Sequence, residues 1–273
     1  LDEKNIEYLC FEKDRDTVYM VVWKRDQNAF LDIQKEVYDY HFSIEHKKEI
    51  VIPQIYHGSD HVLEVPKYGF GSTDADYGQG FYLTKDRQKA DEWAASMGNI
   101  ENATTNEYVL DLQGLNILNL DDYGPLTWIA EIAYNRHAKS ELALLAAELI
   151  CDMYKVDTSN ADIIIGYRAD DSYFSFAADF INGAISYRQL SNAMRLGKLG
   201  QQFVLKSRRA FERLEFTGYE IASVQEWYKR KASRDHMARR QYFDLERNRR
   251  QRGDLYITTI LDEEMKPDDP RLR

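Results

Sequence analysis

The sequence predicts an α+β fold in which helices surround short, mostly antiparallel strands. Short apolar stretches, rich in β-branched and aromatic residues, are bounded by Gly, Ser and Asp, which is typical of strands. Between them, apolar residues recur three and four positions apart, which is typical of helices. The two kinds of segment follow one another without a regular β-α-β alternation. This order favours α+β over a doubly wound parallel sheet.

The predicted strands occur along most of the chain. The first two are rich in β-branched and aromatic residues and form a small hairpin, and the stretch DIIIG at 162–166 reads as a buried strand. In chain order, the predicted strands span residues 7–11, 17–23, 51–57, 81–84, 108–112, 116–120, 162–166, 202–206 and 214–221.

Capping residues and helical spacing locate the predicted helices. Ser and Asp side chains accept hydrogen bonds from the first turn of a helix, and Pro is favoured at its first position. The residues that begin helices in this way are Asp86, Pro125, Ser140, Ser186 and Ser207. Further helices are predicted at 30–40, at 171–181 and over a long basic stretch at 223–252. Residues 255–261 are predicted to be a short apolar strand or turn.

Charge is distributed unevenly, and this helps to divide the chain. The formal net charge of −10 disfavours general adhesion to nucleic acid. Between Lys229 and Arg252, however, ten Lys or Arg residues face three Asp or Glu, a local charge of +7. This basic stretch is either a solvated or packing arm, which is the commoner case, or a surface for an anionic target. We divide the chain into an N-terminal extension (1–50), a main domain (51–222), and a basic helix with an acidic tail (223–273).

Metal, disulfide and membrane functions find no support in the sequence. Cys10 and Cys151 lie far apart and form no CxxC pair, so we expect two thiols in a reducing cytoplasm. No apolar run reaches the roughly 20 residues of a membrane span. Asp170 and Asp171 follow a buried strand; a helix cap is favoured over a metal pair because Asp171 directly precedes an apolar helix. We expect no bound metal and no membrane association. Residues 1–50 carry no catalytic motif, and His41 and His46 lie in a polar stretch.

Three segments of the chain stand out as motifs. The first is IYHGS at 55–59, a hydrophobic-x-His-Gly-Ser strand. The second is YGQGFYLT at 77–84 with the following KADEW at 89–93, and it is the most specific of the three. The third is QFVL at 202–205, and ADIIIGYRADD lies between the second and the third. In this order, the segments resemble the motifs of the ADP-ribosyltransferase superfamily, in its diphtheria-toxin and poly-ADP-ribose-polymerase branch, and they are most similar to bacterial domains of that superfamily whose function is uncharacterised.

The resemblance implies a role for each candidate residue. The superfamily breaks the bond between ribose and nicotinamide of NAD⁺, through an oxocarbenium-like ribose as in glycoside cleavage. Catalytic roles are implied for His57, Tyr82 and Gln202. Tyr82 and Trp93 would hold the nicotinamide ring between them. In the same way, His57 would bond the adenosine ribose, and the backbone of Gly58 and the hydroxyl of Ser59 would bond the carboxamide.

Position 202 departs from the best-known motif, which has glutamate there. Glutamine keeps the hydrogen bonds but loses the charge and the capacity to accept a proton. Poly-ADP-ribose elongation is therefore disfavoured. Gln201 is the alternative residue, because strand alternation allows only one of the two to face a cleft; we favour Gln202. Ala90 is a second departure, since some relatives have serine there.

The sequence therefore predicts a split, mostly antiparallel ADP-ribosyltransferase-like fold and single ADP-ribose transfer from NAD⁺ to a macromolecule, either protein or nucleic acid. The resemblance also implies a bacterial toxin of a toxin–antitoxin or phage-defence system, with an antitoxin protein as a partner. Two alternatives stay open: an NAD⁺ glycohydrolase, and a non-catalytic module that binds NAD⁺ or ADP-ribose.

Overall fold

The computed structural model describes residues 8–14, 17–22, 51–96, 103–136, 141–168, 171–194, 196, 200–247, 249–267 and 269–272. Contacts divide the chain into two compact units, Leu1–Ile50 and Val51–Arg273. In the first unit, β1 (Tyr8–Asp14) pairs antiparallel with β2 (Thr17–Val22), so the predicted hairpin is confirmed. The predicted helix at 30–40, and His41 and His46, lie outside the described residues.

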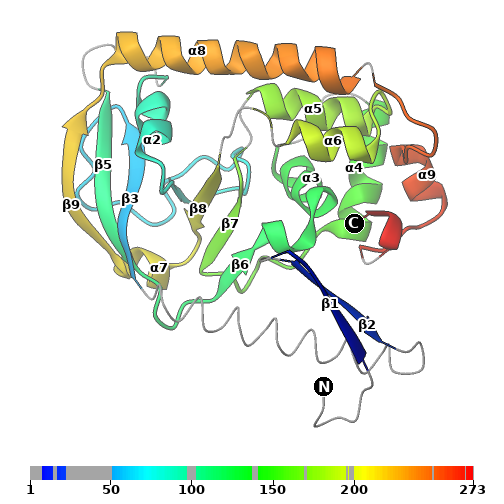
Figure 1. Cartoon of the computed structure of the whole chain (residues 1–273). Helices are drawn as coiled ribbons and strands as arrows, with labels where there is room; N and C mark the ends of the chain where they lie inside the picture. Colours follow the sequence, from blue (N-terminus) through cyan, green and yellow to red (C-terminus); the bar gives the residue numbers. More distant parts are fainter. Residues whose placement is uncertain are drawn as a thin grey trace. The chain divides into compact units, whose positions relative to one another are not determined.

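The second unit contains two sheets (Figure 1). The first has the order β3-β5-β9 and is antiparallel; the second has the order β4-β8-β7-β6, and only its β6–β7 pair is parallel. The backbones of Tyr56 and Thr84 exchange hydrogen bonds of 2.8 and 2.9 Å, which join β3 to β4. The predicted α+β class is confirmed. The strands are β3 (Val51–Ser59), β4 (Phe81–Leu83), β5 (Thr104–Asp111), β6 (Ile117–Asn119), β7 (Ile163–Tyr167), β8 (Gln201–Leu205) and β9 (Leu214–Ile221).

Most helices begin at their predicted capping residues. The side chains of Asp86 and Ser207 accept hydrogen bonds from the first turns of α2 and α7, and Ser186 with Gln189 forms a capping box at α6. The helices are α2 (Arg87–Ala94), α3 (Pro125–Asn135), α4 (Glu141–Tyr154), α5 (Asp171–Ile181), α6 (Tyr187–Ala193), α7 (Arg208–Glu212), α8 (Val224–Gln241) and α9 (Ile257–Asp262). Shorter turns are η3 (Leu120–Tyr123), η5 (Tyr242–Arg247) and η6 (Pro270–Leu272).

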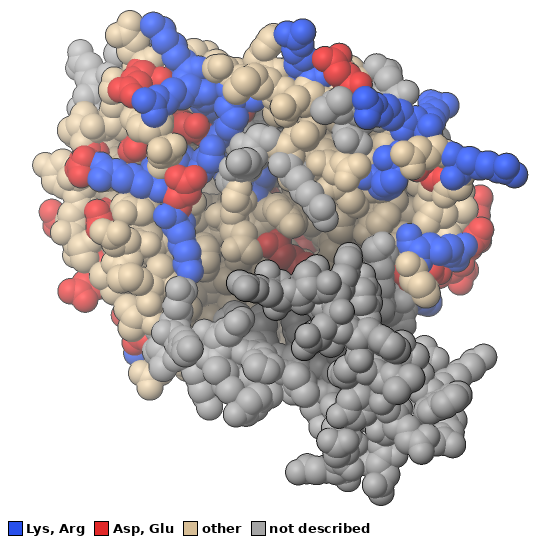
Figure 2. Space-filling model, viewed as in Figure 1, with Lys and Arg blue, Asp and Glu red and all other residues tan. Residues whose placement is uncertain are grey.

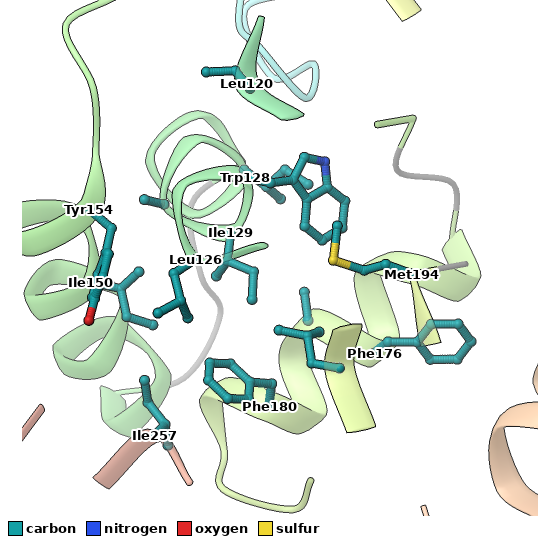
Figure 3. Packing of buried hydrophobic residues seen from close by; sticks show 14 of the residues in the cluster. Leu120, Leu126, Trp128, Ile129, Ile150, Tyr154, Phe176, Phe180, Met194 and Ile257 are labelled. Atoms are coloured by element: carbon teal, nitrogen blue, oxygen red, sulfur yellow. The ribbon is translucent and has the colours of Figure 1, made fainter. Parts of the chain in front are cut away.

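Alternation along the strands of the second sheet separates two hydrophobic clusters. One face packs against the first sheet through Phe81, Leu83, Ile163, Ile165, Phe203 and Leu205. The opposite face, with Ile164 and Val204, packs against the helices. Figure 3 shows part of this helical cluster, to which α3 contributes Trp128, α5 contributes Phe176 and Phe180, and α9 contributes Ile257. The second sheet is therefore covered on both faces.

Two expectations for the C-terminal part are wrong. The basic stretch is not one helix to residue 252, because α8 ends at Gln241 and continues as the wider turn η5. Tyr242 is buried there against the ring of Phe176, with ring centroids 4.0 Å apart. Residues 255–261 are expected to be a strand or turn, but α9 begins within them at Ile257, because Ile257 and Ile260 bury one helical face.

The C-terminal part packs on the rest of the second unit. In Figure 1, α8 passes over α2 and α5, and it contacts both helices. Arg234 of α8 forms an ion pair with the buried Glu92 of α2. One compact unit thus includes both residues 51–222 and residues 223–273. Among the described residues, no helix is long and apolar enough to cross a membrane.

Candidate functional site

His57 is held near the end of β3 as a neutral imidazole. Its Nδ1 lies 2.7 Å from the carbonyl oxygen of Tyr82, and its ring packs on Phe81 with centroids 4.3 Å apart. A carbonyl only accepts, so Nδ1 carries the hydrogen and Nε2 keeps its lone pair. Burial is the main cause that lowers the pKa of His57 to about 4. The side chain can therefore accept a hydrogen bond from a ligand hydroxyl through Nε2.

Gly58 allows α2 to lie directly on β3. A Cβ atom at this position would be 2.1 Å from the carbonyl oxygen of Ala90 and 2.6 Å from the backbone nitrogen of Ala94. Any side chain would push the helix off the strand, and Trp93 would move with it. The resemblance assigns Gly58 to ligand contact, and the structure adds a packing requirement at the same residue.

Ser59 belongs to a buried polar network. Its hydroxyl donates to the carbonyl of His61 (2.5 Å) and accepts from Nδ2 of Asn106 (2.9 Å). Asn106 is fully buried, and its Oδ1 accepts from the backbone nitrogen of Leu63. A hydroxyl oxygen has two lone pairs, so one is left to accept from a carboxamide. The network fixes the turn that follows the first motif.

Tyr82 secures the loop that precedes its own strand. Its hydroxyl donates to the carbonyl of Gly78 (2.6 Å) and accepts from the backbone nitrogen of Tyr77 (3.0 Å). Gly78 has a φ of +68°, a conformation in which glycine is favoured. Lys206 Nζ donates to the carbonyls of Tyr77 and Gln79, both at 2.6 Å. Burial raises the pKa of Tyr82, so the hydroxyl keeps its proton and its donor role.

Trp93 lies in the last turn of α2 and is 39% exposed. The guanidinium carbon of Arg168 lies 4.9 Å from the centre of its ring, within cation–π range. Arg168 is itself 8% exposed and donates from Nη1 to the carbonyl of Lys89 (3.3 Å). It ties the end of β7 to α2 beside the indole. Sequence reasoning did not single out Arg168, although it follows directly after the DIIIGY stretch.

Gln201 and Gln202 point to opposite faces of β8, as strand alternation predicts. Gln201 is exposed, and its Nε2 donates to Oδ2 of Asp121 at 2.5 Å. Gln202 is 7% exposed, and its Nε2 donates to Oδ2 of Asp76 (3.0 Å) and to the carbonyl of Tyr167 (3.3 Å). Asp76 was also missed by sequence reasoning, because an aspartate in a glycine-rich loop resembles a turn residue.

The structure joins the three motifs through two sets of contacts. His57 touches Tyr82 where β3 meets β4. Gln202 touches the carbonyl of Tyr167, whose neighbour Arg168 covers the ring of Trp93. The two sets differ in side-chain direction: His57 packs on Phe81, which faces the first sheet, whereas strand alternation turns Tyr82 and Gln202 toward the helices.

Within the described part of the chain, no group of three or more His, Cys, Asp or Glu side chains is placed to hold a metal ion. Asp170 lies outside the described residues, and Asp171 is the first residue of α5. Figure 2 shows Lys and Arg side chains gathered along the upper edge of the face drawn, over α8.

The fold and the site define a two-sheet α+β protein in which His57 contacts Tyr82 where the sheets join, and Gln202 lies on β8 of the second sheet. A family model described as "Protein of unknown function (DUF3990)" matches residues 54–216, which is more than half of the chain. The chain belongs to this family. The match includes all three motif segments. Comparisons with curated proteins and with solved structures returned no match.

Proposed function

We propose that this protein is a mono-ADP-ribosyltransferase, which transfers ADP-ribose from NAD⁺ to a macromolecular acceptor in the bacterial cytoplasm. The observation that carries the proposal is the meeting of segments far apart in sequence. His57 bonds the carbonyl of Tyr82, and Gln202 bonds the residue next to Arg168, which covers Trp93. His57, Tyr82 and Trp93 are residue types that the superfamily resemblance implies, and Gln202 stands where its best-known motif has glutamate.

The reaction asks little acid–base chemistry of the protein. The bond between ribose C1 and the nicotinamide nitrogen breaks, and its electron pair leaves with neutral nicotinamide. Positive charge then develops on the ribose until an acceptor atom donates a lone pair to C1 and releases its proton to solvent. The amide oxygen of Gln202 is suited to accept a hydrogen bond from a ribose hydroxyl while this charge develops. Neutral His57 is suited to accept from the other ribose through Nε2.

Glutamine at 202 favours a single transfer. An amide cannot take a proton from a weakly nucleophilic sugar hydroxyl, so the acceptor must be more reactive, such as a nucleobase or a guanidinium. Such chemistry suits a toxin of a toxin–antitoxin or phage-defence system, whose antitoxin would be a protein partner. The two alternatives differ in their acceptor: a glycohydrolase uses water, and a binding module uses none.

The test incubates the protein with NAD⁺ labelled in the adenylate half, with and without bacterial lysate. It measures two quantities: the nicotinamide released, and the label that enters macromolecules. We expect release to require lysate and the label to enter one of the protein, RNA or DNA fractions. Release without lysate would establish hydrolysis instead, and no release in either case would contradict enzymatic function. His57→Ala is the inactive variant, and His61→Ala is its control, since the His61 side chain is 64% exposed.

A further inference from the structure

Gln202 has one well-defined amide orientation, which the buried carboxylate of Asp76 determines. Asp76 lies in the loop before β4 and is 5% exposed. Its Oδ2 accepts from Gln202 Nε2 at 3.0 Å, and its Oδ1 pairs with Nη2 of Arg136 at 2.6 Å. Arg136 follows the last residue of α3. A buried carboxylate is stable only when paired in this way.

Two acceptors lie within hydrogen-bond distance of the Gln202 amide nitrogen, Asp76 Oδ2 and the carbonyl oxygen of Tyr167. Of the two atoms of the amide, only the nitrogen can donate to them. The Tyr167 carbonyl also accepts from Nε1 of Trp128 (3.2 Å), so Asp76 is the acceptor that depends most on Gln202. A flipped amide would turn Oε1 toward both oxygens, so the network itself assigns the orientation. The hydroxyl of Tyr77 gives its single proton to the carbonyl of Tyr167. No described residue donates a hydrogen bond to Oε1 of Gln202.

We infer that Asp76, supported by Arg136, is a positioning residue that presents Oε1 of Gln202, rather than its nitrogen, to the ribose hydroxyl of NAD⁺. The inference rests on the proposed function. With a nitrogen in that place, the side chain would offer a donor where the developing positive charge requires an acceptor. Asp76 would thus act on turnover through Gln202 without contacting NAD⁺.

Asp76→Asn tests the inference because asparagine has a single side-chain oxygen. That oxygen pairs with the Arg136 cation, which leaves Nδ2 facing Gln202 and favours the flipped amide. We expect turnover of NAD⁺ to fall by on the order of 10–100-fold, with KM changed much less, because the lost contact belongs to the transition state. Asp121→Asn is the matched control: Asp121 holds Gln201 as Asp76 holds Gln202, and this variant should retain wild-type turnover.

The double variant Asp76→Asn with Gln202→Glu distinguishes positioning from a structural role. Asparagine Nδ2 would then donate to the new carboxylate, and the second carboxylate oxygen would face the ribose. Partial recovery of turnover over Asp76→Asn is expected. Turnover at the wild-type level in Asp76→Asn would overturn the inference. So would loss in Asp76→Asn that the double variant does not recover.

A measurement on the wild-type chain covers the case in which Asp76→Asn does not fold. The side-chain ¹⁵N amide signal of Gln202, assigned by its absence in Gln202→Met, should exchange slowly with solvent because its nitrogen donates to Asp76 and Tyr167. The exposed Gln201 amide should exchange faster. Equal exchange would overturn the inference.

Failure of the proposed function and failure of the inference give different results. A wild-type chain that releases no nicotinamide would contradict the proposed function, and the inference with it. An active wild-type chain with an unaffected Asp76→Asn variant would contradict the inference alone.

Discussion

Single residues set the chemistry of the site mainly through their hydrogen-bond partners. His57 is an example, because the carbonyl of Tyr82 fixes its tautomer and burial fixes its charge. A neutral histidine can accept a hydrogen bond from a ribose hydroxyl through Nε2, whereas a protonated histidine could only donate to that hydroxyl. The charge state of His57 is therefore a checkable part of the proposal.

The first prediction concerns the pH dependence of stability. The folded pKa of His57 is about 4, below its ordinary value of 6.5, so the unfolded chain binds a proton in this window when the folded chain does not. The free energy of unfolding should therefore fall as pH decreases from about 6.5 to about 4, and this contribution should be complete above that window. In His57→Gln the contribution is absent. Denaturant unfolding of the wild type and of His57→Gln across this pH range measures the contribution. If the difference between their free energies of unfolding does not vary with pH, the lowered pKa of His57 is contradicted.

The second prediction concerns Trp93. Its ring is 39% exposed, so Trp93→Ala should weaken NAD⁺ affinity while costing the fold little. Aromatic stacking supplies about 0.5–1.5 kcal/mol beyond area burial, so a several-fold to tenfold loss is expected by calorimetry. Trp227→Ala is the control, because Trp227 also lies under an arginine, Arg230, at 4.6 Å. Equal NAD⁺ affinity in the wild type and Trp93→Ala would remove Trp93 from the site.

At the scale of elements, the packing of α2 on β3 places the second motif. The third prediction is that Gly58→Ala destabilises the fold by about 1–3 kcal/mol, as expected of overpacking. The added Cβ would lie 2.1 Å from the carbonyl of Ala90, which is backbone and cannot turn aside. Gly218→Ala is the matched control in the same sheet, because no atom lies within 4 Å of its added Cβ. Urea unfolding compares the two, and a Gly58→Ala protein as stable as Gly218→Ala would contradict the packing.

The elements that sequence predicted well are those whose signals are local. Asp86, Ser186 and Ser207 cap helices through hydrogen bonds to the next few residues, so a short stretch contains the information. The end of α8 has no such signal. It depends on Tyr242, whose ring packs on Phe176 and whose hydroxyl donates to Asp179, residues far away in sequence. The missed α9 has the same cause: its apolar residues suit a strand or a helix until their packing partners are known.

The candidate site shows the same limit. The motif residues were recognisable because they lie in short stretches with particular spacing. Asp76 and Arg168 were not recognised, because their importance comes from Gln202 and Trp93, which contact them only in the folded chain. The orientation of the Gln202 amide was likewise beyond sequence reasoning, since it is determined by two acceptors on a loop and a strand.

For the whole molecule, the C-terminal part is integral to the second unit. The helical cluster includes Tyr242, Ile257, Ile260, Met265 and Leu272, all buried. Arg234 of α8 also balances the buried carboxylate of Glu92 on α2. Removing residues 223–273 would expose the apolar cluster and leave that carboxylate without Arg234.

The fourth prediction follows from this packing. A chain that ends at residue 222 should lose cooperative thermal unfolding. Each large apolar side chain that is removed takes away about 1.5–3 kcal/mol of burial free energy. Several such losses, together with the newly exposed core, exceed the typical stability of a domain, about 5–15 kcal/mol. Circular dichroism during heating compares it with the full chain. A cooperative transition at the full-length midpoint would show instead that residues 51–222 fold independently.

The measurement that tests the central claim most directly is the turnover of NAD⁺ by Gln202→Ala and Gln201→Ala, beside their NAD⁺ affinities. Gln202 is buried at the proposed site, whereas Gln201 is exposed and bonded to Asp121. We predict that Gln202→Ala lowers nicotinamide release by on the order of 10²–10³ with little change in affinity, because the lost contact strengthens only as the ribose becomes cationic. Gln201→Ala should retain wild-type release. Loss of release in Gln201→Ala alone, or wild-type release in both variants, would contradict the account.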